Sequence, residues 1–481
     1  MKTHYLLVDL GTGNTRVALA CSDGTILGLR TVSNTYYRDD AYGDAQYFLP
    51  EEWQKQILRC CRELHQEFPD IRPAAMSSAG ARQSIVLLDR AGHPFYGLPN
   101  IDNRGREYMD AIQDRDTVYR LSGKWVTEDF CAAKLLGFRM RYPELYEKVG
   151  TVLSISEWIA QIFTGVSAME PSQACETQLY DLENGEWSRH LCDDYGVGRE
   201  LLPPLLPAGA VIAPILPEFR RELNMAENAV FIMGGADTQV ALKQTALTTG
   251  DIAVVSGTTS PVVTVTKEKY YDPLQRVWTD ANLGGGDFLV EMNPGVTGLN
   301  YQRIKASLGS DLSYGALEEA YAKKTDFQCT ASFSSLLFYR QQSLRKGGFF
   351  TRSPMAAELD RIDMMWAVLG DIACSIYEQL SHLTGLVGND RDYVLGCGGG
   401  FQSGTLCQML ADLSGRQLRL APGFEQATVQ GLISICNETL GLPGGSSGGE
   451  KICFLPRKEQ LIHAYYPLWM ENRNRANQIV P

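Results

Sequence analysis

The sequence predicts an α/β protein built from two related halves, each a mixed β-sheet flanked by helices, with a cleft between them. Three observations lead to this prediction. The 481 residues are too many for one hydrophobic core. Two apolar strand–turn–strand segments, at residues 5–20 and 252–265, lie about half a chain apart. Strand-like and helix-like patterns alternate after each of them.

The first half is expected to start with antiparallel strands and to continue with mixed structure. A third strand should follow the segment at residues 5–20. The elements expected after it are a helix over 53–68, strands over 74–77 and 84–89, a turn at 90–93, helical structure over 108–162 broken at Tyr142-Pro143, a proline-rich connection over 201–217 and a strand over 229–233. Apolar residues three or four apart indicate the helices, and short apolar runs indicate the strands.

The second half restarts with the segment at residues 252–265. The elements expected after it are a hairpin turn at 284–286, a helix over 362–383, a strand over 392–395, a glycine cluster at 396–400, a helix over 403–413 ending at Gly415, and a flexible glycine-rich loop over 441–449. We place the domain border after residue 246. The N-terminal domain then covers residues 1–246 and the C-terminal domain residues 247–481.

The composition is that of an ordinary globular protein, with 44% hydrophobic and 21% charged residues. With a net charge of −12, the sequence lacks the excess of positive charge that is typical of proteins that bind nucleic acid or anionic lipid. The N-terminus lacks a signal-peptide pattern, and no apolar run approaches the ~20 residues of a membrane span. We therefore expect a cytoplasmic protein with neither a nucleic-acid nor a membrane partner.

The 12 cysteines are scattered along the chain, and the sequence contains no C-x-x-C and no H-x-x-x-H spacing. In a chain of this kind, such cysteines are small buried hydrophobes far more often than disulfides or metal ligands. We expect reduced, buried thiols and no metal held by cysteine or histidine.

Each strand–turn–strand segment turns through glycine, threonine and small polar residues, at residues 11–14 and 257–258. Glycine lets the backbone approach a ligand closely, and the exposed N–H groups of such turns form a nest for anions. A plain β-hairpin is the alternative for the first turn. Two such turns at matching places in two halves indicate a nucleotide held between them.

Four motifs fall in the order seen in the FGGY carbohydrate kinases. They begin at Asp9 (Asp-Leu-Gly-Thr-Gly-Asn-Thr-Arg), Gly234 (Gly-Gly-Ala-Asp-Thr-Gln), Gly257 (Gly-Thr-Thr-Ser) and Gly398 (Gly-Gly-Gly-Phe-Gln-Ser). The chain resembles that family over nearly its whole length. The resemblance implies two actin-like (ribonuclease H-like) domains that close over ATP, Mg²⁺ and a small carbohydrate or polyol.

By this resemblance, Asp9 holds Mg²⁺ through water, since a carboxylate at a strand end beside a glycine turn suits that ion. The positions implied to contact ATP are Gly11, Thr12, Gly13, Asn14, Arg16, Gly257, Thr258, Gly399, Gly400 and Ser403. Gly399 and Gly400 would give adenine a flat wall, and Ser403 either caps the next helix or contacts the nucleotide. Family members usually carry a hydroxyl residue at position 13, so Gly13 loses one side-chain contact.

Asp237 follows two glycines at the end of an expected strand. Phosphoryl transfer to an alcohol needs a group that orients the hydroxyl and accepts its proton, and a carboxylate in a closing cleft suits that role. The resemblance implies that Asp237 is this catalytic base and contacts the substrate. The alternative is an aspartate that caps a helix starting near Thr238.

Sugar hydroxyls are bound by donors and acceptors beside an aromatic face. Arg82 and Gln83 stand where the glycerol kinase branch of the family has an Arg-Glu pair. Gln83 therefore replaces the acidic side chain of that pair with a neutral one. Asp102 and Phe130 lie in segments that resemble the family's sugar site. The alternatives are a surface arginine at position 82 and a solvated Asp102–Arg104 ion pair.

Within the family, the features that resemble the autoinducer-2 kinase branch are Arg82, residues 100–102, residues 275–277 leading to 293–301, and residues 333–335. A pentulose, a polyol or another linear hydroxylated carbonyl compound fits the substrate residues equally well. The substrate and the hydroxyl that is phosphorylated therefore stay open, as does a homodimer.

The expected function is ATP-dependent transfer of the γ-phosphoryl group to a hydroxyl of a small sugar, polyol or related linear compound. The alternative is a catalytically weak sugar or nucleotide sensor on the same fold, suggested by Gly13 and Gln83. An actin-like or chaperone-like ATPase is a third class. The sugar-site segments at residues 82–83 and 100–104 disfavour it.

Overall fold

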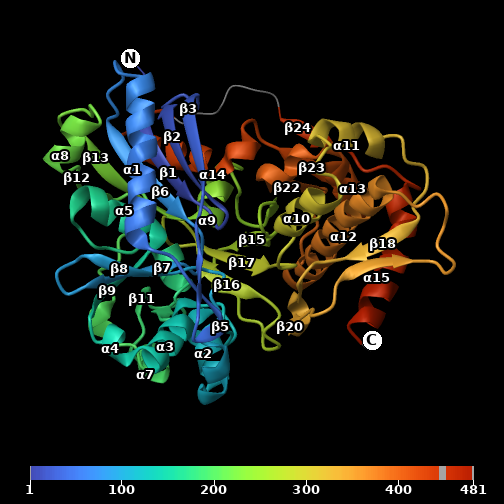
Figure 1. The fold of residues 1–481 in the computed structure, drawn as a ribbon, viewed down its shortest axis with the longest axis horizontal. Helices are drawn as coiled ribbons and strands as arrows, with labels where there is room; N and C mark the ends of the chain where they lie inside the picture. Colours follow the sequence, from blue (N-terminus) through green and yellow to red (C-terminus); the bar gives the residue numbers. More distant parts are fainter. Residues whose placement is uncertain (1, 444–450, 479–481) are drawn as a thin grey trace.

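The computed structural model describes residues 2–443 and 451–478. Each half of the chain contains one large mixed β-sheet (Figure 1). The first sheet has the order β12-β13-β6-β1-β2-β3. Its strands are β1 (His4–Leu10), β2 (Asn14–Cys21), β3 (Ile26–Ser33), β6 (Ala75–Gly80), β12 (Val211–Pro214) and β13 (Val230–Ala236). Strands β1, β6 and β13 run parallel, and the others run antiparallel to their neighbours.

The second sheet has the order β16-β17-β15-β14-β22-β23-β24. Its strands are β14 (Ile252–Val255), β15 (Val262–Thr266), β16 (Trp278–Ala281), β17 (Phe288–Met292), β22 (Tyr393–Cys397), β23 (Gln417–Leu420) and β24 (Ile452–Phe454). Six of these strands repeat the directions of the first sheet, with β14, β22 and β23 as the parallel set. Strand β16 is the addition, since it lies beyond β17 at the edge.

Smaller sheets and the remaining helices fill out the two halves. The smaller sheets pair β4 (Tyr37–Asp39) with β5 (Tyr42–Tyr47), β7 (Ile85–Asp89) with β8 (Pro94–Leu98) and β9 (Val149–Ser154), β10 (Tyr180–Asp181) with β11 (Glu186–Trp187), β18 (Cys329–Ser332) with β21 (Gly348–Thr351), and β19 (Leu336–Leu337) with β20 (Gln342–Ser343). The helices not described in the next two paragraphs are α2 (Arg115–Ser122), α3 (Cys131–Arg141), α4 (Pro143–Tyr146), α6 (Pro171–Cys175), α7 (Arg189–Tyr195), α8 (Pro217–Glu222), α9 (Asp237–Lys243), α10 (Gly298–Leu308) and α11 (Tyr314–Tyr321).

Helices cover both faces of the first sheet. One face packs against α1 (Pro50–Glu67) and α5 (Ile155–Thr164), which bury an apolar stripe that includes Trp53 and Trp158. The other face packs against α14 (Ala427–Thr439), a helix that belongs to the second half of the sequence. Tyr5 of β1 donates a hydrogen bond to Asn437 of that helix, with 2.6 Å between Oη and Oδ1. The two halves therefore share a core.

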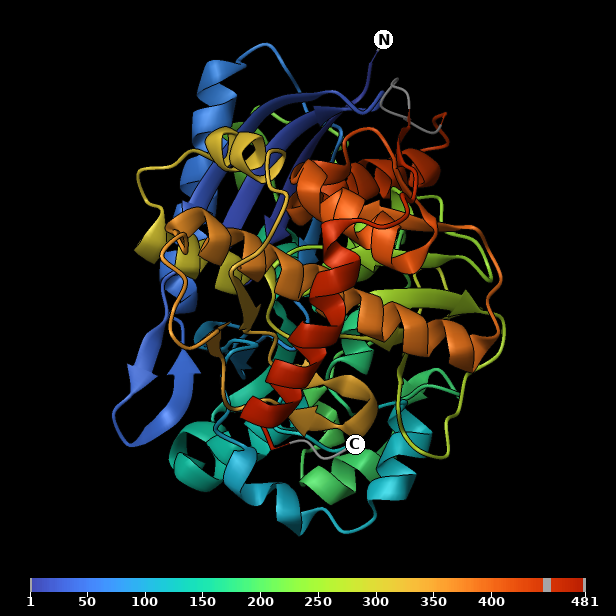
Figure 2. The same cartoon turned by 90° about the vertical axis from the view of Figure 1, so that its right-hand side faces the viewer.

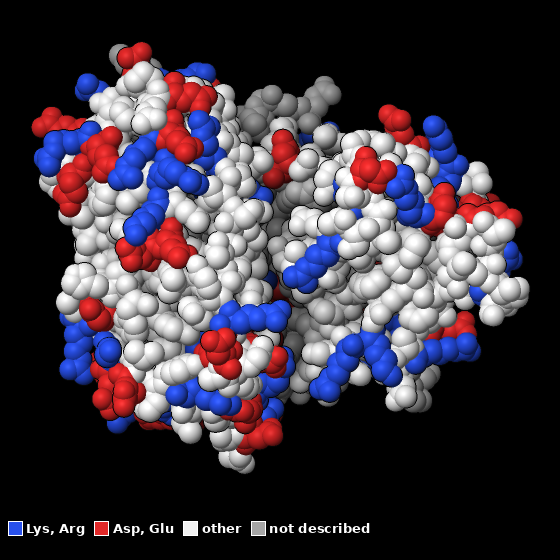
Figure 3. Space-filling view, viewed as in Figure 1, with Lys and Arg blue, Asp and Glu red and all other residues white. Residues whose placement is uncertain are grey.

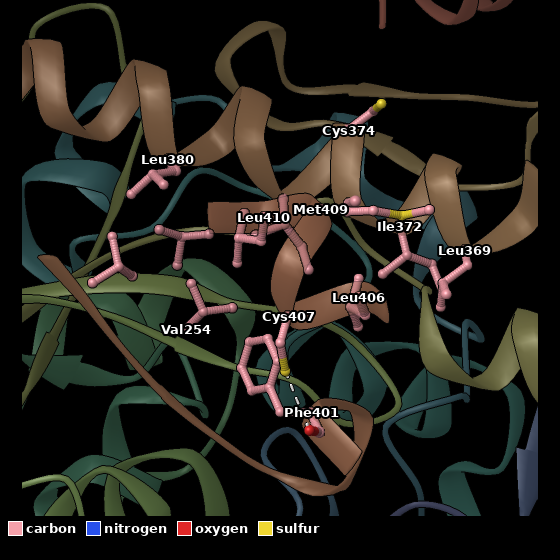
Figure 4. Close-up of a cluster of buried hydrophobic side chains, with 14 of the residues drawn as sticks. Val254, Leu369, Ile372, Cys374, Leu380, Phe401, Leu406, Cys407, Met409 and Leu410 are labelled. Atoms are coloured by element: carbon pink, nitrogen blue, oxygen red, sulfur yellow. Dashed lines mark hydrogen bonds between the residues drawn. The ribbon is translucent and has the colours of Figure 1, made fainter. Parts of the chain in front are cut away.

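The core of the second half lies under α12 (Arg361–Val387) and α13 (Gly404–Ser414). Figure 4 shows Leu369, Ile372 and Leu380 of α12 and Leu410 of α13 in one buried cluster that also includes Val254 of β14. The last helix, α15 (Leu461–Ala476), runs along the outer side of this core (Figure 2). Every residue of α12 from 365 to 376 is buried, so the middle of this helix is enclosed on all sides within the second half.

Most of the elements expected from the sequence are present with shifted ends, the predicted helix over 53–68 being α1 and the predicted helix over 403–413 being α13. The turn at 284–286 joins β16 to β17, and all three of its glycines have positive φ. Two expectations are wrong: residues 211–214 of the expected proline-rich connection form β12, and residues 149–154 form β9 inside the stretch expected to be helical. A short apolar run with β-branched residues pairs there with β7, and tertiary pairing outweighs the helical pattern on either side. The loop expected over 441–449 lies mostly outside the described residues.

The two sheets divide between Ala236 and Ile252, so the expected domain border falls in the segment that joins them. The border itself stays a prediction, since α14 packs on the sheet of the other half. We call the two parts of the molecule that contain the two large sheets its lobes. A groove separates the two lobes on the face seen in Figure 3. Within the part of the chain that the structure describes, no helix combines the length and the hydropathy needed to cross a membrane.

The expected burial of the cysteine side chains is confirmed for all but one of them. All 12 thiols are free, and all except Cys453 are buried. Figure 4 shows one of them, Cys407, whose Sγ lies 3.3 Å from the carbonyl oxygen of Phe401. Burial raises the pKa of this thiol, as expected for a small hydrophobe inside a core.

Candidate active site

Three polar residues lie at the ends of three neighbouring strands of the first sheet. Leu10 of β1 and Ala236 of β13 both pair with Gly80 of β6, so the carboxyl ends of these parallel strands lie at one edge. Asp9 lies next to the last residue of β1, Arg82 lies two residues beyond β6, and Asp237 comes directly after β13. In open α/β sheets ligands bind at this edge. Residues far apart in the sequence therefore form one site.

Asp237 is the first residue of α9, and Ala236 is its N-cap. The alternative of a helix-capping aspartate is therefore not what the structure shows, although Asp237 Oδ1 accepts a hydrogen bond from the Thr238 backbone N–H at 2.7 Å. Burial raises the pKa of Asp237 to about 6, with the positive charge of Arg82 opposing the shift and the negative charge of Asp9 adding to it. A carboxyl with that pKa is more basic than an exposed aspartate and is still mostly ionised at neutral pH, which suits a proton acceptor.

The backbone before Asp237 is fixed by two features. Gly234 lies against β6 so closely that a Cβ there would come within 1.9 Å of the Ser78 carbonyl oxygen. The Ala236 N–H donates a hydrogen bond to Ser172 Oγ at 3.0 Å. The Ser172 hydroxyl in turn donates to the buried carboxyl of Glu170. Neither Ser172 nor Glu170 was predicted from the sequence, because they carry no motif of their own.

The first glycine turn joins β1 to β2, and two side chains that follow β3 hold its carbonyl groups. The Gly11 N–H donates to the Asn14 carbonyl at 3.0 Å, and Asn34 Nδ2 donates to the Gly11 carbonyl at 2.7 Å. Tyr36 donates its hydroxyl to the Thr12 carbonyl at 2.5 Å. Gly13 is exposed, and a Cβ placed on it meets no atom within 4 Å. The turn is thus rigid and open on its outer side.

Asp9 is buried and pairs with Arg16 across the β1–β2 ladder, with 3.1 Å between Oδ2 and Nη1. Burial raises the pKa of Asp9, and the Arg16 charge opposes that shift. The described residues contain no cluster of three or more His, Cys, Asp or Glu able to enclose a metal ion. Asp9 and Asp237 do fit Mg²⁺, because that ion is usually held by one or two carboxylates together with substrate phosphates.

The second glycine turn follows β14 in the same way as the first follows β1. Val255 of β14 pairs with Cys397 of β22, so this turn and the glycine cluster that follows β22 meet at one edge of the second sheet. The Gly400 N–H donates to the Ser256 carbonyl at 2.9 Å. A Cβ on Gly400 would come within 2.1 Å of Ser256 Oγ, so a larger residue there would displace the Ser256 hydroxyl. Gly257 and Gly399 are exposed beside this contact, and Thr258 is half-buried.

Ser403 is the N-cap of α13, and its Oγ accepts a hydrogen bond from the Leu406 N–H at 3.1 Å. Of the two roles considered for Ser403, the structure shows the cap. The same hydroxyl donates to Glu318 of α11, with 2.5 Å between Oγ and Oε1. Glu318 also accepts from Thr405, and it therefore ties α11 to the start of α13.

Arg82 is buried and pairs across the lobes with Glu291 of β17. Its Nη1 lies 2.6 Å from Glu291 Oε2 and its Nη2 lies 3.0 Å from Glu291 Oε1. The alternative of a surface arginine is wrong. Glu176 lies on the other side, with Oε1 3.7 Å from Arg82 Nη1. Burial opposes the charge of Arg82, but Glu291, Glu176 and Asp280 together outweigh it and raise the pKa of the guanidinium.

Gln83 contacts Glu176, the carboxylate that also lies beside Arg82. It has a positive φ of 62°, and its Nε2 donates to Glu176 Oε2 at 2.9 Å. The buried Lys134 Nζ donates to the Gln83 carbonyl at 2.7 Å and to the Asp129 carbonyl at 2.7 Å. Burial lowers the pKa of Lys134, and the carboxylates around it oppose that shift.

Asp102 and Arg104 form an ion pair, with 2.7 Å between Oδ2 and Nε. The pair is buried, so the solvated alternative is wrong. The other Asp102 oxygen accepts from the Gln46 N–H at 2.9 Å. These bonds, together with the one from Arg104 Nη2 to the Gln46 carbonyl, brace the segment at residues 100–104 against β5.

Phe130 is fully buried between the lobes. Its ring lies edge-on to Trp278 of β16, with ring centroids 5.1 Å apart. Trp125 and Phe338 complete this aromatic group, at 4.9 Å and 4.9 Å from Trp278. The structure thus brings Phe130 next to residues of the second half that no sequence motif indicated.

Comparisons with known proteins agree with this geometry. The model of the FGGY family of carbohydrate kinases, N-terminal domain, matches residues 4–243. A Bacillus subtilis (strain 168) protein named "Putative sugar kinase YoaC" is 39% identical over 471 residues, covering 98% of this chain and 96% of the relative. The Autoinducer-2 kinase of Salmonella choleraesuis (strain SC-B67) is 24% identical over 497 residues, covering 98% of this chain and 93% of that protein.

Solved structures share the fold over the full length. The ligand-bound xylulose kinase from Lactobacillus acidophilus superposes with a TM-score of 0.82 at 18% identity, covering 98% of each chain. The Plasmodium falciparum glycerol kinase with ADP gives a TM-score of 0.84 at 15% identity, covering 100% of this chain and 99% of that one. At these identities the likeness concerns the fold alone.

Proposed function

The chain belongs to the FGGY family of carbohydrate kinases, and on that premise we propose that it transfers the γ-phosphoryl group of ATP to a hydroxyl of a small sugar, polyol or related linear hydroxylated compound. One observation carries the proposal: Asp9, Arg82 and Asp237 meet at the carboxyl ends of three neighbouring strands. This reaction needs a carboxylate near the phosphates, a cation near the acceptor hydroxyl and a carboxylate with a raised pKa.

In this proposal Asp237 orients the acceptor hydroxyl and takes its proton as the oxygen attacks the γ-phosphorus. The raised pKa makes the carboxylate a better base than an exposed aspartate, while leaving it ionised at neutral pH. Ser172 holds the Ala236 N–H and thereby fixes the start of α9, which carries Asp237. Lobe closure would exclude water, which could otherwise accept the phosphoryl group.

The nucleotide would lie across the two glycine turns. We propose that Gly11, Thr12, Gly13, Asn14 and Arg16 meet the phosphates from the first half, and that Gly257 and Thr258 meet them from the second. The exposed, rigid turn at Gly13 supports this placement. Gly399, Gly400 and Ser403 are proposed to border the adenosine. Mg²⁺ held near Asp9 would neutralise charge on the phosphates.

The sugar would lie on the side of Arg82. We propose that Arg82 and Gln83 contact it directly and that Phe130 and Asp102 shape its surroundings. The influence of Arg82 on the pKa of Asp237 supports this role, because it places the guanidinium near the proposed base. A cytoplasmic location is also proposed, and the free cysteines support a reducing compartment. The homodimer stays a prediction.

The test is a panel of polyols and ketoses with three to six carbons, followed by ADP release and by product mass. A kinase gives ADP that depends on the acceptor and a product heavier by one phosphoryl group. The sensor alternative requires binding without ADP release. An actin-like or chaperone-like ATPase would release ADP with no carbohydrate present. Inactivity on every compound of the panel would contradict the proposed function.

A further inference from the structure

Two buried glutamates lie beside the strand ends that precede Arg82 and Asp237. Glu157 is in the first turn of α5, and Glu170 is the N-cap of the short helix α6. Both side chains are only 1% exposed. No basic side chain is among the largest influences on the pKa of either carboxyl. The two acids are therefore buried without the cation that usually accompanies a buried charge.

Glu170 lies against the end of β13. A Cβ added to Gly235 would come within 2.9 Å of Glu170 Oε2 and 3.1 Å of Ser172 Oγ. Glu170 Oε2 accepts hydrogen bonds from the Ser172 backbone N–H, at 2.7 Å, and from the Ser172 hydroxyl. Ser172 Oγ accepts from the Ala236 N–H at 3.0 Å. A chain of hydrogen bonds thus runs from Glu170 to the residue before Asp237.

Glu157 is connected to the end of β6 in a similar way. Its Oε2 accepts from the hydroxyls of Ser154 and Ser156, the latter at 2.7 Å. Gln173 of α6 donates through Nε2 to Ser156 Oγ at 3.0 Å and to the carbonyl oxygen of Gly80, the last residue of β6, at 2.9 Å. One polar network thus links the starts of α5 and α6 to the ends of β6 and β13.

This network has more acceptors than donors. Three of its buried oxygens have no hydrogen-bond partner among the described residues, namely the Oε1 atoms of Glu157, Glu170 and Gln173. The serine hydroxyls and the Gln173 amide already donate elsewhere. An ionised carboxylate only accepts, whereas a protonated one also carries an O–H donor. Buried polar atoms are nearly always satisfied, and one proton on a carboxyl is the smallest change that supplies a donor.

Burial keeps both carboxyls from ionising readily. It raises the pKa of Glu157 to about 7, while the Ser156 hydroxyl and the Glu170 N–H oppose the shift. It raises the pKa of Glu170 to about 8, where hydrogen bonds from Ser172 oppose the shift and the negative charge of Glu157 adds to it. Because Glu157 feels the Glu170 N–H and Glu170 feels the Glu157 charge, the two groups titrate as a pair.

The strands that pack most extensively against α5 and α6 carry no lysine or arginine. The titratable side chains on these strands are His4, Tyr5 and Asp9 of β1, Asp89 of β7, Tyr180 and Asp181 of β10, and Asp280 of β16, and α6 itself adds Cys175. Burial lowers the pKa of His4, so it is neutral at neutral pH. Burial raises the pKa of Tyr180, and Cys175 and Glu170 add to the shift. None of these groups brings a positive charge to the pair.

Resting on the proposed function, we propose that Glu170 is a positioning residue for Asp237 and that it shares one proton with Glu157. The proton supplies the donor that the unpartnered oxygens lack, and it leaves a single negative charge on the pair. Glu170 Oε2 then holds Ser172, whose hydroxyl fixes the Ala236 N–H at the start of α9. Neither glutamate touches the substrate, since both act through the backbone that carries the proposed base.

The first experiment measures turnover in Glu170→Gln, Glu157→Gln and Glu170→Ala. Glutamine has the shape of a protonated glutamate and donates through its amide, so each Gln variant should keep kcat within ~3-fold of wild type at neutral pH. Glu170→Ala removes the acceptor that holds Ser172, so kcat should fall by ~10-fold or more while KM for ATP stays within ~2-fold. Glu186→Gln is the matched control, because Glu186 of β11 is exposed.

The second experiment needs no substrate. The folded pair retains a proton that an exposed glutamate releases near pH 4.5, so this contribution to wild-type stability is lost as the pH rises from about 5 to about 8. Glu170→Gln has no such proton to lose. Its folding equilibrium constant relative to wild type should therefore grow by ~10²-fold over this range, measured by urea denaturation at both pH values. Glu186→Gln should follow wild type at both.

An unchanged kcat in folded Glu170→Ala would overturn the positioning role. A Glu170→Gln variant as slow as Glu170→Ala would overturn the shared proton, as would a Glu170→Gln stability that follows wild type with pH. If Glu170→Ala does not fold, Glu170→Asp takes its place, because the shorter side chain draws the carboxyl away from Ser172 and the same loss of kcat is expected. If wild type phosphorylates no compound, the proposed function fails, and the urea measurement still decides the shared proton.

Discussion

Arg82 and Glu291 form a two-pronged ion pair between the lobes, with Nη1–Oε2 and Nη2–Oε1 distances of 2.6 Å and 3.0 Å. Arg82 follows strand β6 of the first sheet, and Glu291 lies on β17 of the second. The pair joins the proposed sugar site to the half of the chain that is proposed to border the adenosine of ATP. The residues are 209 positions apart in the sequence and almost completely buried.

Breaking this pair should destabilise the protein. Glu291→Ala leaves the Arg82 charge buried without its main partner, a change that costs about 3–5 kcal/mol of unfolding free energy. Urea denaturation followed by tryptophan fluorescence measures it. Asp287→Ala removes an exposed ion pair from the same hairpin and should cost about 0–1 kcal/mol. Equal losses for the two variants would show that the Arg82–Glu291 pair is not a structural link.

The loss of kcat/KM at acidic pH should reflect the protonation of Asp237. Only the ionised carboxylate can accept a proton, and its pKa is raised to about 6. The value of kcat/KM should therefore rise as the pH increases through about 6 and level off above it. Asp9→Asn removes a negative charge that raises this pKa, so the limb of the residual activity should move to lower pH. A limb near pH 4 in wild type would contradict the assignment.

Restoring a hydroxyl at position 13 should strengthen nucleotide binding. Gly13 is exposed, and a Cβ added there would meet only open space, so serine fits without strain. One added hydrogen bond to phosphate, ~0.5–1.5 kcal/mol, lowers KM for ATP by about 2- to 10-fold. Gly400→Ser is the contrasting variant, because its Cβ would collide with Ser256. An unchanged KM for ATP in Gly13→Ser would place the phosphates away from this turn.

Ser172 is expected to act as a positioning residue. Ser172→Ala removes the acceptor of the Ala236 N–H and lets the first turn of α9 shift. Small displacements of a catalytic group are costly, so kcat should fall by ~10-fold or more with little change in KM for ATP. Ser172→Thr keeps the hydroxyl and should restore most of the rate. A variant that loses thermal stability but keeps its kcat would assign Ser172 a structural role only.

Much of the fold could be predicted because its signals are local. The two strand–turn–strand segments and the glycine motifs predicted an α/β fold with two mixed sheets, which the two sheets and the likeness to solved structures confirm. Strand β9 was missed, because its apolar run is short and lies between helices. Its identity as a strand depends on pairing with β7, some 60 residues earlier.

The candidate site could be predicted only where a motif marks it. Asp9 and Asp237 stand beside glycines at strand ends, whereas Asp280 and Glu291 are single charges in apolar strands. Such a charge is itself a signal, since a buried charge needs a partner. The partner cannot be named from sequence, because Lys124 lies 156 positions from Asp280 and only the docking of the two lobes brings them together.

The most direct test of the central claim is the turnover of Asp237→Asn, which removes the proposed base and keeps the size of the side chain. With an acceptor identified from the panel, we predict that kcat falls by roughly 10²–10⁴-fold while ATP binding, measured by calorimetry, is retained. A circular dichroism melt checks that the variant is folded. Near-normal turnover in the folded variant would remove Asp237 from the mechanism and contradict the account.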